Sequence, residues 1–254
     1  RFIFNTGAKY INRASLPWEA ETDYTNHMAY YKNNIDKIHA IDSDIILEAA
    51  IYETVFKSCE QVAIPEWVFK AFGKTPEKRN FNYQKMLFPS GKYVNHWEEG
   101  ASVPDITQLE TQMYFYFRAC KYIDAGFEAI HWGQVMLIGE NDTNHVNYHK
   151  VLSMVREYAK THARRRFVVM NGSTSGMKGP DGKLLYDFHL FPARMRPENG
   201  SISHPPSESN PQKCILEVGH IDSIYKKSMG GLTVSGWSTT SLPYIVDIDN
   251  YGGF

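Results

Sequence analysis

The stretch that decides the fold is Phe127–Asp142, FEAIHWGQVMLIGEND. It follows Gly126, a residue of the kind that commonly ends a helix, and it begins with an apolar, strand-like run. The run then passes into polar and aromatic side chains, and a second amphipathic helix is predicted after it. A strand that carries polar groups at its carboxyl end, between two helices, is typical of the active-site face of an α/β barrel.

On both sides of this stretch, predicted strands alternate with predicted helices. The strands are expected at 1–8, 44–53, 127–137, 167–171, 184–192, 214–219 and 243–250, and the helices at 18–40, 66–72, 105–124 and 144–162. Such alternation predicts a parallel sheet. Because no Gly-rich dinucleotide fingerprint and no P-loop follow the strands, an α/β fold of the (β/α)8 TIM-like barrel class is favoured over a nucleotide-binding sheet. The segment 184–192 fits either a barrel strand or a hairpin arm.

The length of the chain fits one domain. Its 254 residues match a single α/β barrel domain spanning 1–254. Residues 73–104 are rich in Gly, Pro, Asn and aromatic side chains, so we expect an expanded loop there, over the substrate side of the barrel. Strand-like runs stand close to both ends of the sequence, so the barrel is expected to be incomplete at one or both ends.

Composition limits the partners of the protein. The formal net charge is −1, which argues against nucleic acid or a membrane surface as the main partner. No run approaches the ~20 apolar residues of a membrane span. The basic run Arg164–Arg166 stands where a helix should end, and there it would complement the helix dipole. Cys59, Cys120 and Cys214 form neither a CxxC pair nor a metal knuckle, and Cys120 is expected to be a buried thiol.

Aromatic side chains favour a carbohydrate partner. They make up 14% of the chain, and many stand in or beside polar loops. Rings interleaved with amides and carboxylates suit a sugar, whose C–H faces stack on aromatics while its hydroxyls take polar partners. The alternative is that a large barrel simply buries many rings.

Carboxylates at the carboxyl ends of the strands suggest glycoside hydrolysis. That reaction needs two carboxyl groups across the scissile bond, about 5–5.5 Å apart for retention or about 6.5–9.5 Å apart for inversion. Glu140 follows an apolar run near Trp132, so it is the predicted acid. Glu217 is the predicted nucleophile or base, and Glu53 is the reserve for either role.

Other polar and aromatic residues at the predicted strand ends would bind the substrate. In a barrel, the carboxyl ends of different strands converge on one pocket. The predicted substrate-binding residues are His131, Trp132, Gln134, Asn171, Asp187, His189, His220, Trp237, Asp247 and Asp249. No cofactor is expected, and the oligomeric state is not predicted.

Four segments together carry a resemblance to known proteins. They are EAIHWGQVMLIGEND (128–142), LLYDFHLFPAR (184–194), GGLTVSGW (230–237) and LPYIVDIDNYG (242–252). Their succession resembles TIM-barrel, glycoside-hydrolase-like proteins of gut-type bacteria, an uncharacterised family. The resemblance implies a barrel fold and sugar-related activity in a hydrolase. The location is left open, with a periplasmic or secreted one preferred.

Two other functions remain open at this point. His131, Asp187, His189, Glu217, His220 and Asp249 are suitable ligand types for a divalent-metal-dependent hydrolase or isomerase, although neither HExxH nor a His-x-His at the first strand occurs. A non-catalytic, glycan-binding barrel would keep the tryptophans and would need no paired acids.

Overall fold

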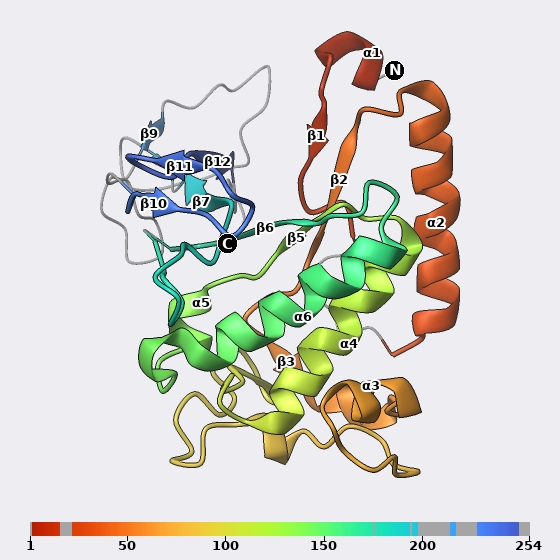
Figure 1. The fold of residues 1–254 in the computed structure, drawn as a ribbon, viewed down its shortest axis with the longest axis vertical. Helices are drawn as coiled ribbons and strands as arrows, with labels where there is room; N and C mark the ends of the chain where they lie inside the picture. The colour runs from red at the N-terminus through yellow and green to blue at the C-terminus, as the bar shows by residue number, and fades with distance from the viewer. Residues whose placement is uncertain are drawn as a thin grey trace.

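The main sheet of the protein is parallel. The computed structural model describes residues 2–15, 22–174, 176–193, 195–197, 214–216 and 228–248. Across these residues the sheet has six strands in the order β1-β2-β5-β6-β7-β12, and each neighbouring pair is parallel (Figure 1). The strands are β1 (Tyr10–Ile11), β2 (Ile46–Ala50), β5 (Ala129–His131), β6 (Val169–Gly172), β7 (Phe188–Ala193) and β12 (Tyr244–Ile248).

The sheet is strongly curled. In a flat sheet, four strand spacings of about 4.8 Å would separate β1 from β7 by roughly 19 Å. Instead, the rings of Tyr10 on β1 and Phe188 on β7 meet edge to face with their centroids 5.7 Å apart. The amide of Asn171 on β6 also reaches the Tyr10 hydroxyl at 3.5 Å. These side chains therefore face one another inside a concave surface.

The predicted fold, a (β/α)8 TIM-like barrel that is incomplete at one or both ends, is wrong. The curled sheet is a half-barrel whose edge strands in the described residues are β1 and β12. Past residue 162 the described chain has turns and two-stranded antiparallel pairs in place of helices. These pairs join β8 (Met195–Pro197) to β9 (Cys214–Leu216), and β10 (Gly231–Leu232) to β11 (Ser238–Thr239). The Gly, Ser and Pro content of this half disfavours the helices that would complete a barrel.

Helices cover the convex face of the half-barrel. They are α2 (Tyr24–Ile41), α4 (Leu109–Ala125) and α6 (Val146–His162), with α4 packed between the other two (Figure 1). All three match helices that apolar periodicity predicts. Gly126 ends α4 with a φ of 104°, which confirms the predicted glycine stop.

The start of the chain departs from the prediction. Residues 1–8 were expected to form a strand, yet Phe2–Thr6 is a short helix, α1, and the first strand is Tyr10–Ile11. A short apolar run fits either a helix or a strand, so periodicity cannot separate the two. The shift matters because it places Tyr10 inside the sheet.

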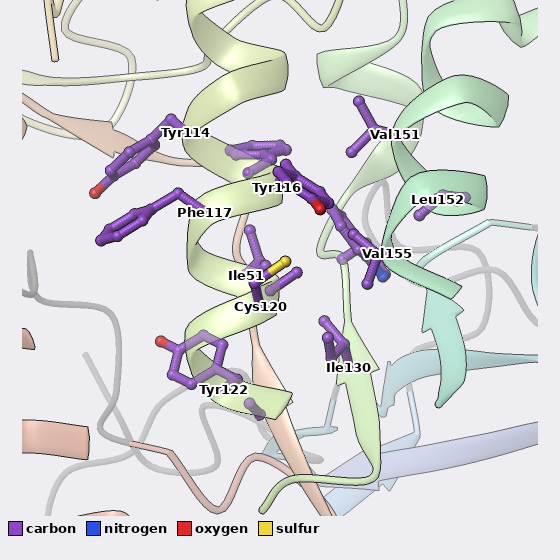
Figure 2. Close-up of a cluster of buried hydrophobic side chains, with 14 of the residues drawn as sticks. Ile51, Tyr114, Tyr116, Phe117, Cys120, Tyr122, Ile130, Val151, Leu152 and Val155 are labelled. Carbon is purple, nitrogen blue, oxygen red and sulfur yellow. The ribbon is translucent and has the colours of Figure 1, made fainter. Parts of the chain in front are cut away.

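One hydrophobic core joins the convex face to its helices. Figure 2 shows part of this cluster, with Cys120 of α4 and Val155 of α6 gathered with Ile51 and Ile130 of the sheet side. Cys120 is fully buried, as its position on the apolar stripe predicts. Burial raises the pKa of this thiol, so Cys120 is a packing residue. None of the helices in the described residues is long and apolar enough to cross a membrane.

The basic run after α6 has a more specific role than helix-dipole compensation. Arg164 and Arg165 both reach the buried carboxylate of Glu128, at 2.9 Å and 3.1 Å. Both guanidinium groups also donate to the carbonyl oxygen of Ser43. The two arginines therefore neutralise a buried acid at the start of β5, and Arg166 is not part of this contact.

A long connection between β2 and α4 lies beyond the carboxyl end of β2. It contains β3 (Val55–Phe56), η1 (Lys57–Gln61), α3 (Glu66–Ala71), η2 (Gln84–Met86) and β4 (Ala101–Ser102). The predicted loop at 73–104 is the second part of it. Arg79 fastens it to α4 through two hydrogen bonds to Glu110, of 2.6 Å and 2.9 Å, and the backbone N–H of Asn82 donates to the same carboxylate at 2.8 Å.

Replacing Arg79 should destabilise the protein through this loop. Arg79→Met leaves Glu110, which is 4% exposed, with one donor. We expect a loss of about 2 kcal/mol in the free energy of unfolding, less than the ~3–5 kcal/mol of a fully buried pair because solvent screens a partly exposed one. Urea unfolding measures this loss. Glu77→Gln removes the exposed partner of Arg79 and should change stability by less than about 0.5 kcal/mol, so equal losses in the two variants would contradict the account.

Candidate active site

A hydrogen-bonded network lines the concave face of the half-barrel. We call it the floor network, and its members are Tyr10, Glu48, His131 and Asn171. The Tyr10 hydroxyl and the Asn171 amide both donate to the Glu48 carboxylate. The side-chain oxygen of Asn171 in turn pairs with Nδ1 of His131 at 2.7 Å. The register puts these four residues on one face of the sheet. Asn171 and Ala50 both pair with His131, and Tyr10 pairs with Ile46. Glu48 is two residues from both Ile46 and Ala50, so its side chain points to the same face.

Burial shapes the charges of the floor network. Glu48 is 0% exposed, and its burial raises the pKa of the carboxyl group, which the bonds from Tyr10 and Asn171 partly offset. Burial, helped by the charge of Arg13, lowers the pKa of His131 to about 3. His131 is therefore neutral near pH 7. Because Asn171 offers an oxygen to Nδ1, His131 donates there and keeps its lone pair on Nε2.

The residues that follow the carboxyl ends of β1, β2 and β5 form a second group around this floor, which we call the rim: Arg13, Tyr52, Glu53 and Gln134. The backbone N–H of Gln134 donates to Oε2 of Glu53 and its side-chain amide donates to Oε1, both at 2.9 Å. Gly133 makes this approach possible, since a Cβ there would lie 2.2 Å from Oε2 of Glu53. The Glu53 carboxylate is thus held in one orientation at the active-site edge of the sheet.

Arg13 and Tyr52 complete the rim. The Arg13 guanidinium lies 5.7 Å from the centre of the Tyr52 ring, and that ring meets His131 edge to face at 6.2 Å. Arg13, Tyr52 and Gln134 are each partly exposed, whereas the floor beneath them is mostly buried. Glu53 is only 5% exposed, so a ligand would meet Arg13, Tyr52 and Gln134 first.

Sequence patterns did not assign a role to Tyr10, Arg13, Tyr52 or Glu48. The strand expected at 1–8 ends before Tyr10, and no pattern assigns a role to Arg13, which follows that strand. Glu48 did leave a signal, because a carboxylate within the otherwise apolar run at 45–51 must be buried and needs partners. That signal points to a polar network but does not name its other members.

Glu140 is not with the other predicted site residues. Its exposed carboxylate pairs with Lys92 at 2.5 Å and accepts a bond from the Tyr93 hydroxyl at 2.7 Å. The hydrogen bond from Lys92 lowers the pKa of Glu140 most, and the hydrogen bond from Tyr93 lowers it further. A glycosidase acid needs a raised pKa, so this environment is opposite to the one that the predicted acid role requires.

Two other predicted substrate-binding residues, Trp132 and His189, are directed elsewhere. Trp132 is 0% exposed and packs against Phe115 in the helix-covered core, with ring centres 6.1 Å apart, so it offers no stacking surface. His189 is also fully buried and alternates with Phe188 along β7, which puts it on the opposite face from Asn171. Burial lowers its pKa to about 4.

Asp187 and Trp237 lie at the other end of the sheet. The predicted strand 184–192 begins later, at Phe188, so Asp187 precedes the strand instead of following it. Its carboxylate accepts a bond from the backbone N–H of Met170 at 2.9 Å and one from the Ser235 hydroxyl. Asp187 and Trp237 line a cavity beside the amino ends of β6 and β7.

The remaining predicted residues belong to the last part of the chain. Glu217, His220 and Asp249 lie outside the described residues. Asp247 stands on β12 opposite Pro192 of β7, near the carboxyl end of the strand. The segment before Glu217 is not a barrel strand as predicted, because Cys214–Leu216 pairs antiparallel with β8.

Two further findings bear on function. Within the described residues, no group of three or more His, Cys, Asp or Glu side chains is placed to hold a metal ion. The chain matches no known protein family, and no curated protein matches it. Its function is therefore inferred from the residues of the half-barrel themselves.

The buried histidines predict a stability that falls in mild acid. Between the ordinary pKa of 6.5 and the value of about 3 for His131, the unfolded chain binds a proton that the folded chain does not. The folded state is therefore most stable above pH 6.5, and the free energy of unfolding decreases as the pH drops. We expect His131 alone to account for a loss of about 2 kcal/mol in unfolding free energy between pH 6.5 and pH 5.

Urea unfolding of a His131→Gln variant at several pH values measures this effect. The raised pKa of Glu48 acts in the opposite direction, because its folded form retains a proton above the ordinary value of 4.5. The variant should therefore show a clearly smaller decrease between pH 6.5 and pH 5 than the wild type. His162→Gln, at the exposed end of α6, is the control. An unchanged pH dependence in His131→Gln would contradict a buried, neutral imidazole.

Proposed function

We propose that this protein binds a carbohydrate at the carboxyl edge of the half-barrel and hydrolyses a glycosidic bond there. The observation that carries the proposal is the Glu53 carboxylate, held by two hydrogen bonds from Gln134 at the end of β2. In α/β barrels, catalytic groups come from the carboxyl ends of the strands. Glu53 is one of the three carboxylates that the sequence suggests for this reaction.

The surroundings of Glu53 suit a sugar. Tyr52 supplies a partly exposed ring on which a C–H face could stack, while Arg13 and Gln134 supply donors for hydroxyl groups. The floor network below is held in place by its own hydrogen bonds, so little ordering would accompany binding. This combination supports a preorganised site for a polar ligand.

The proposed chemistry gives Glu53 the part of the nucleophile or base. As nucleophile, its oxygen would form a bond to the anomeric carbon as the glycosidic bond breaks; as base, it would take the proton of the attacking water. The leaving oxygen needs a proton from a second carboxyl group. We assign this part to Glu217, which the sequence suggests as a nucleophile or base, because Glu140 is paired with Lys92.

A screen of plant and host polysaccharides for released sugar tests the proposal. The wild type should release reducing sugar from at least one glycan, and Glu53→Gln, purified in the same way, should not. Binding of the same glycan to both proteins, measured by calorimetry, separates hydrolysis from simple glycan binding. Binding without release in the wild type would favour a non-catalytic glycan-binding protein. If no glycan of the panel is either bound or cleaved, the carbohydrate proposal is wrong.

A further inference from the structure

A cavity at the opposite end of the sheet has the features of a second ligand site. It has a volume of about 750 Å³, within the ~300–1,000 Å³ range of small-molecule sites. The residues that lead into β6, β7 and β12 form its wall, together with the last turns of α6 and the β10–β11 hairpin. We call it the N-terminal cavity because it lies beside the amino (N-terminal) ends of the strands. Glu53, in contrast, follows the carboxyl end of β2.

The charged residues of the N-terminal cavity are mostly cationic. Arg156, Lys160 and Arg166 line it, against the single carboxylate of Asp187. Arg156 lies 3.5 Å from Asp187, and Lys160 pairs with Glu157 outside the cavity lining. Arg166 is exposed, and the described residues supply no hydrogen-bond or ion-pair partner for its side chain. The cavity thus carries an uncompensated positive charge.

A buried polar atom beside the same cavity lacks an acceptor among the described residues. Arg156 donates through one terminal nitrogen to the carbonyl oxygen of Leu185 at 2.7 Å. Its Nε is buried and has no hydrogen-bond partner within the part of the chain that the structure describes. A buried donor without an acceptor is costly, so within the described chain Arg156 leaves one hydrogen bond unmade at this end of the sheet.

The rest of the wall is apolar and unusually exposed. Phe167 is 46% exposed and Trp237 is 38% exposed, and both face the cavity with Phe188, Pro243 and Ile245. Large exposed rings that line a hollow commonly mark a binding site. Their stacking area and the nearby cations together specify a ligand with an apolar, ring-sized body and an anionic group.

From these features we propose that the N-terminal cavity binds a small amphiphilic anion, an aromatic or aliphatic body bearing a carboxylate, sulfonate or phosphate. Arg166 faces the anionic group, and Phe167 and Trp237 hold the body. The proposal does not depend on glycoside hydrolysis at the carboxyl edge. A failed polysaccharide screen leaves it untouched.

Two fluorescent probes with nearly the same ring system test the proposal. The sulfonate 8-anilinonaphthalene-1-sulfonate carries both features, whereas N-phenyl-1-naphthylamine lacks the anion. The wild type should bind the sulfonate at one site per chain and more tightly than the amine. Arg166→Gln should weaken sulfonate binding about 3- to 10-fold and leave the amine unchanged, as expected for one charge-assisted contact. Trp237→Ala should weaken both probes.

The controls separate a specific site from general attraction. Lys74→Gln removes one exposed cation that does not line the cavity, so it should leave both probes unchanged. Arg166 and Trp237 are exposed, so their variants should keep the wild-type melting temperature, and this is checked first. Equal sulfonate affinity in Arg166→Gln and the wild type would overturn the proposal. Equal weakening in Lys74→Gln, or no sulfonate binding up to about 1 mM, would overturn it too.

Discussion

Glu53→Gln should lower the turnover of a glycan substrate by about 10²- to 10⁴-fold, the usual contribution of one acid–base group. The amide keeps the shape of the carboxylate but can neither attack an anomeric carbon nor take a proton. It also turns an N–H toward one of the two donors of Gln134, so a modest loss of stability is expected as well. Steady-state kinetics below the melting temperature of the variant measure the effect on turnover.

Glu140→Gln is the matched control for this prediction. It makes the same chemical change at a carboxylate that is exposed and paired with Lys92. Turnover should stay within about twofold of the wild type, because an exposed ion pair contributes little and the residue lies apart from the rim. A large loss in Glu140→Gln with little change in Glu53→Gln would reverse the assignment of the two residues.

Gly133→Ala should destabilise the protein by about 3 kcal/mol or more and disturb Glu53 directly. The new Cβ would lie 2.2 Å from Oε2 of Glu53 and 2.7 Å from its backbone nitrogen, so the backbone between β2 and β5 must shift. The φ of 66° adds roughly 1 kcal/mol for any residue with a Cβ. Urea unfolding measures the loss, and the turnover of the folded fraction should fall together with it.

Gly73→Ala separates the clash from the backbone strain. Gly73 has nearly the same φ, 65°, but a Cβ there would have no neighbour within 4 Å. It should therefore cost only about 1 kcal/mol and leave turnover unchanged. If the two alanine variants were equally stable, the close packing of Glu53 against Gly133 would not be a feature of the protein.

After its first eleven residues, the first half of the chain could be predicted well from its sequence. Helices such as α4 have a regular apolar stripe and a glycine stop, and both signals are local. The strand at 44–53 was visible as an apolar run, and the structure has β2 within it. The second half was not predictable in the same way, because its short strands pair with segments far away in the chain.

The candidate site could be predicted only in part. Glu53, Gln134, His131 and Asn171 follow or end predicted strands, and the structure brings them to one edge. Glu140 was misjudged because its partner Lys92 stands 48 residues earlier, in a loop whose path no pattern reveals. Asp187 was misjudged because a few residues of error in a strand boundary move a side chain to the opposite end of the sheet.

Chemical rescue of Glu53→Ala by sodium azide tests the central assignment most directly. The deleted carboxylate leaves space beside Gln134 for a small anion that can attack the anomeric carbon in its place. On the best glycan from the screen, the variant should lose about 10²- to 10⁴-fold in rate, and azide should restore at least about tenfold with formation of a glycosyl azide. A variant that keeps wild-type turnover, or one that binds the glycan normally but gains nothing from azide, would contradict a catalytic Glu53.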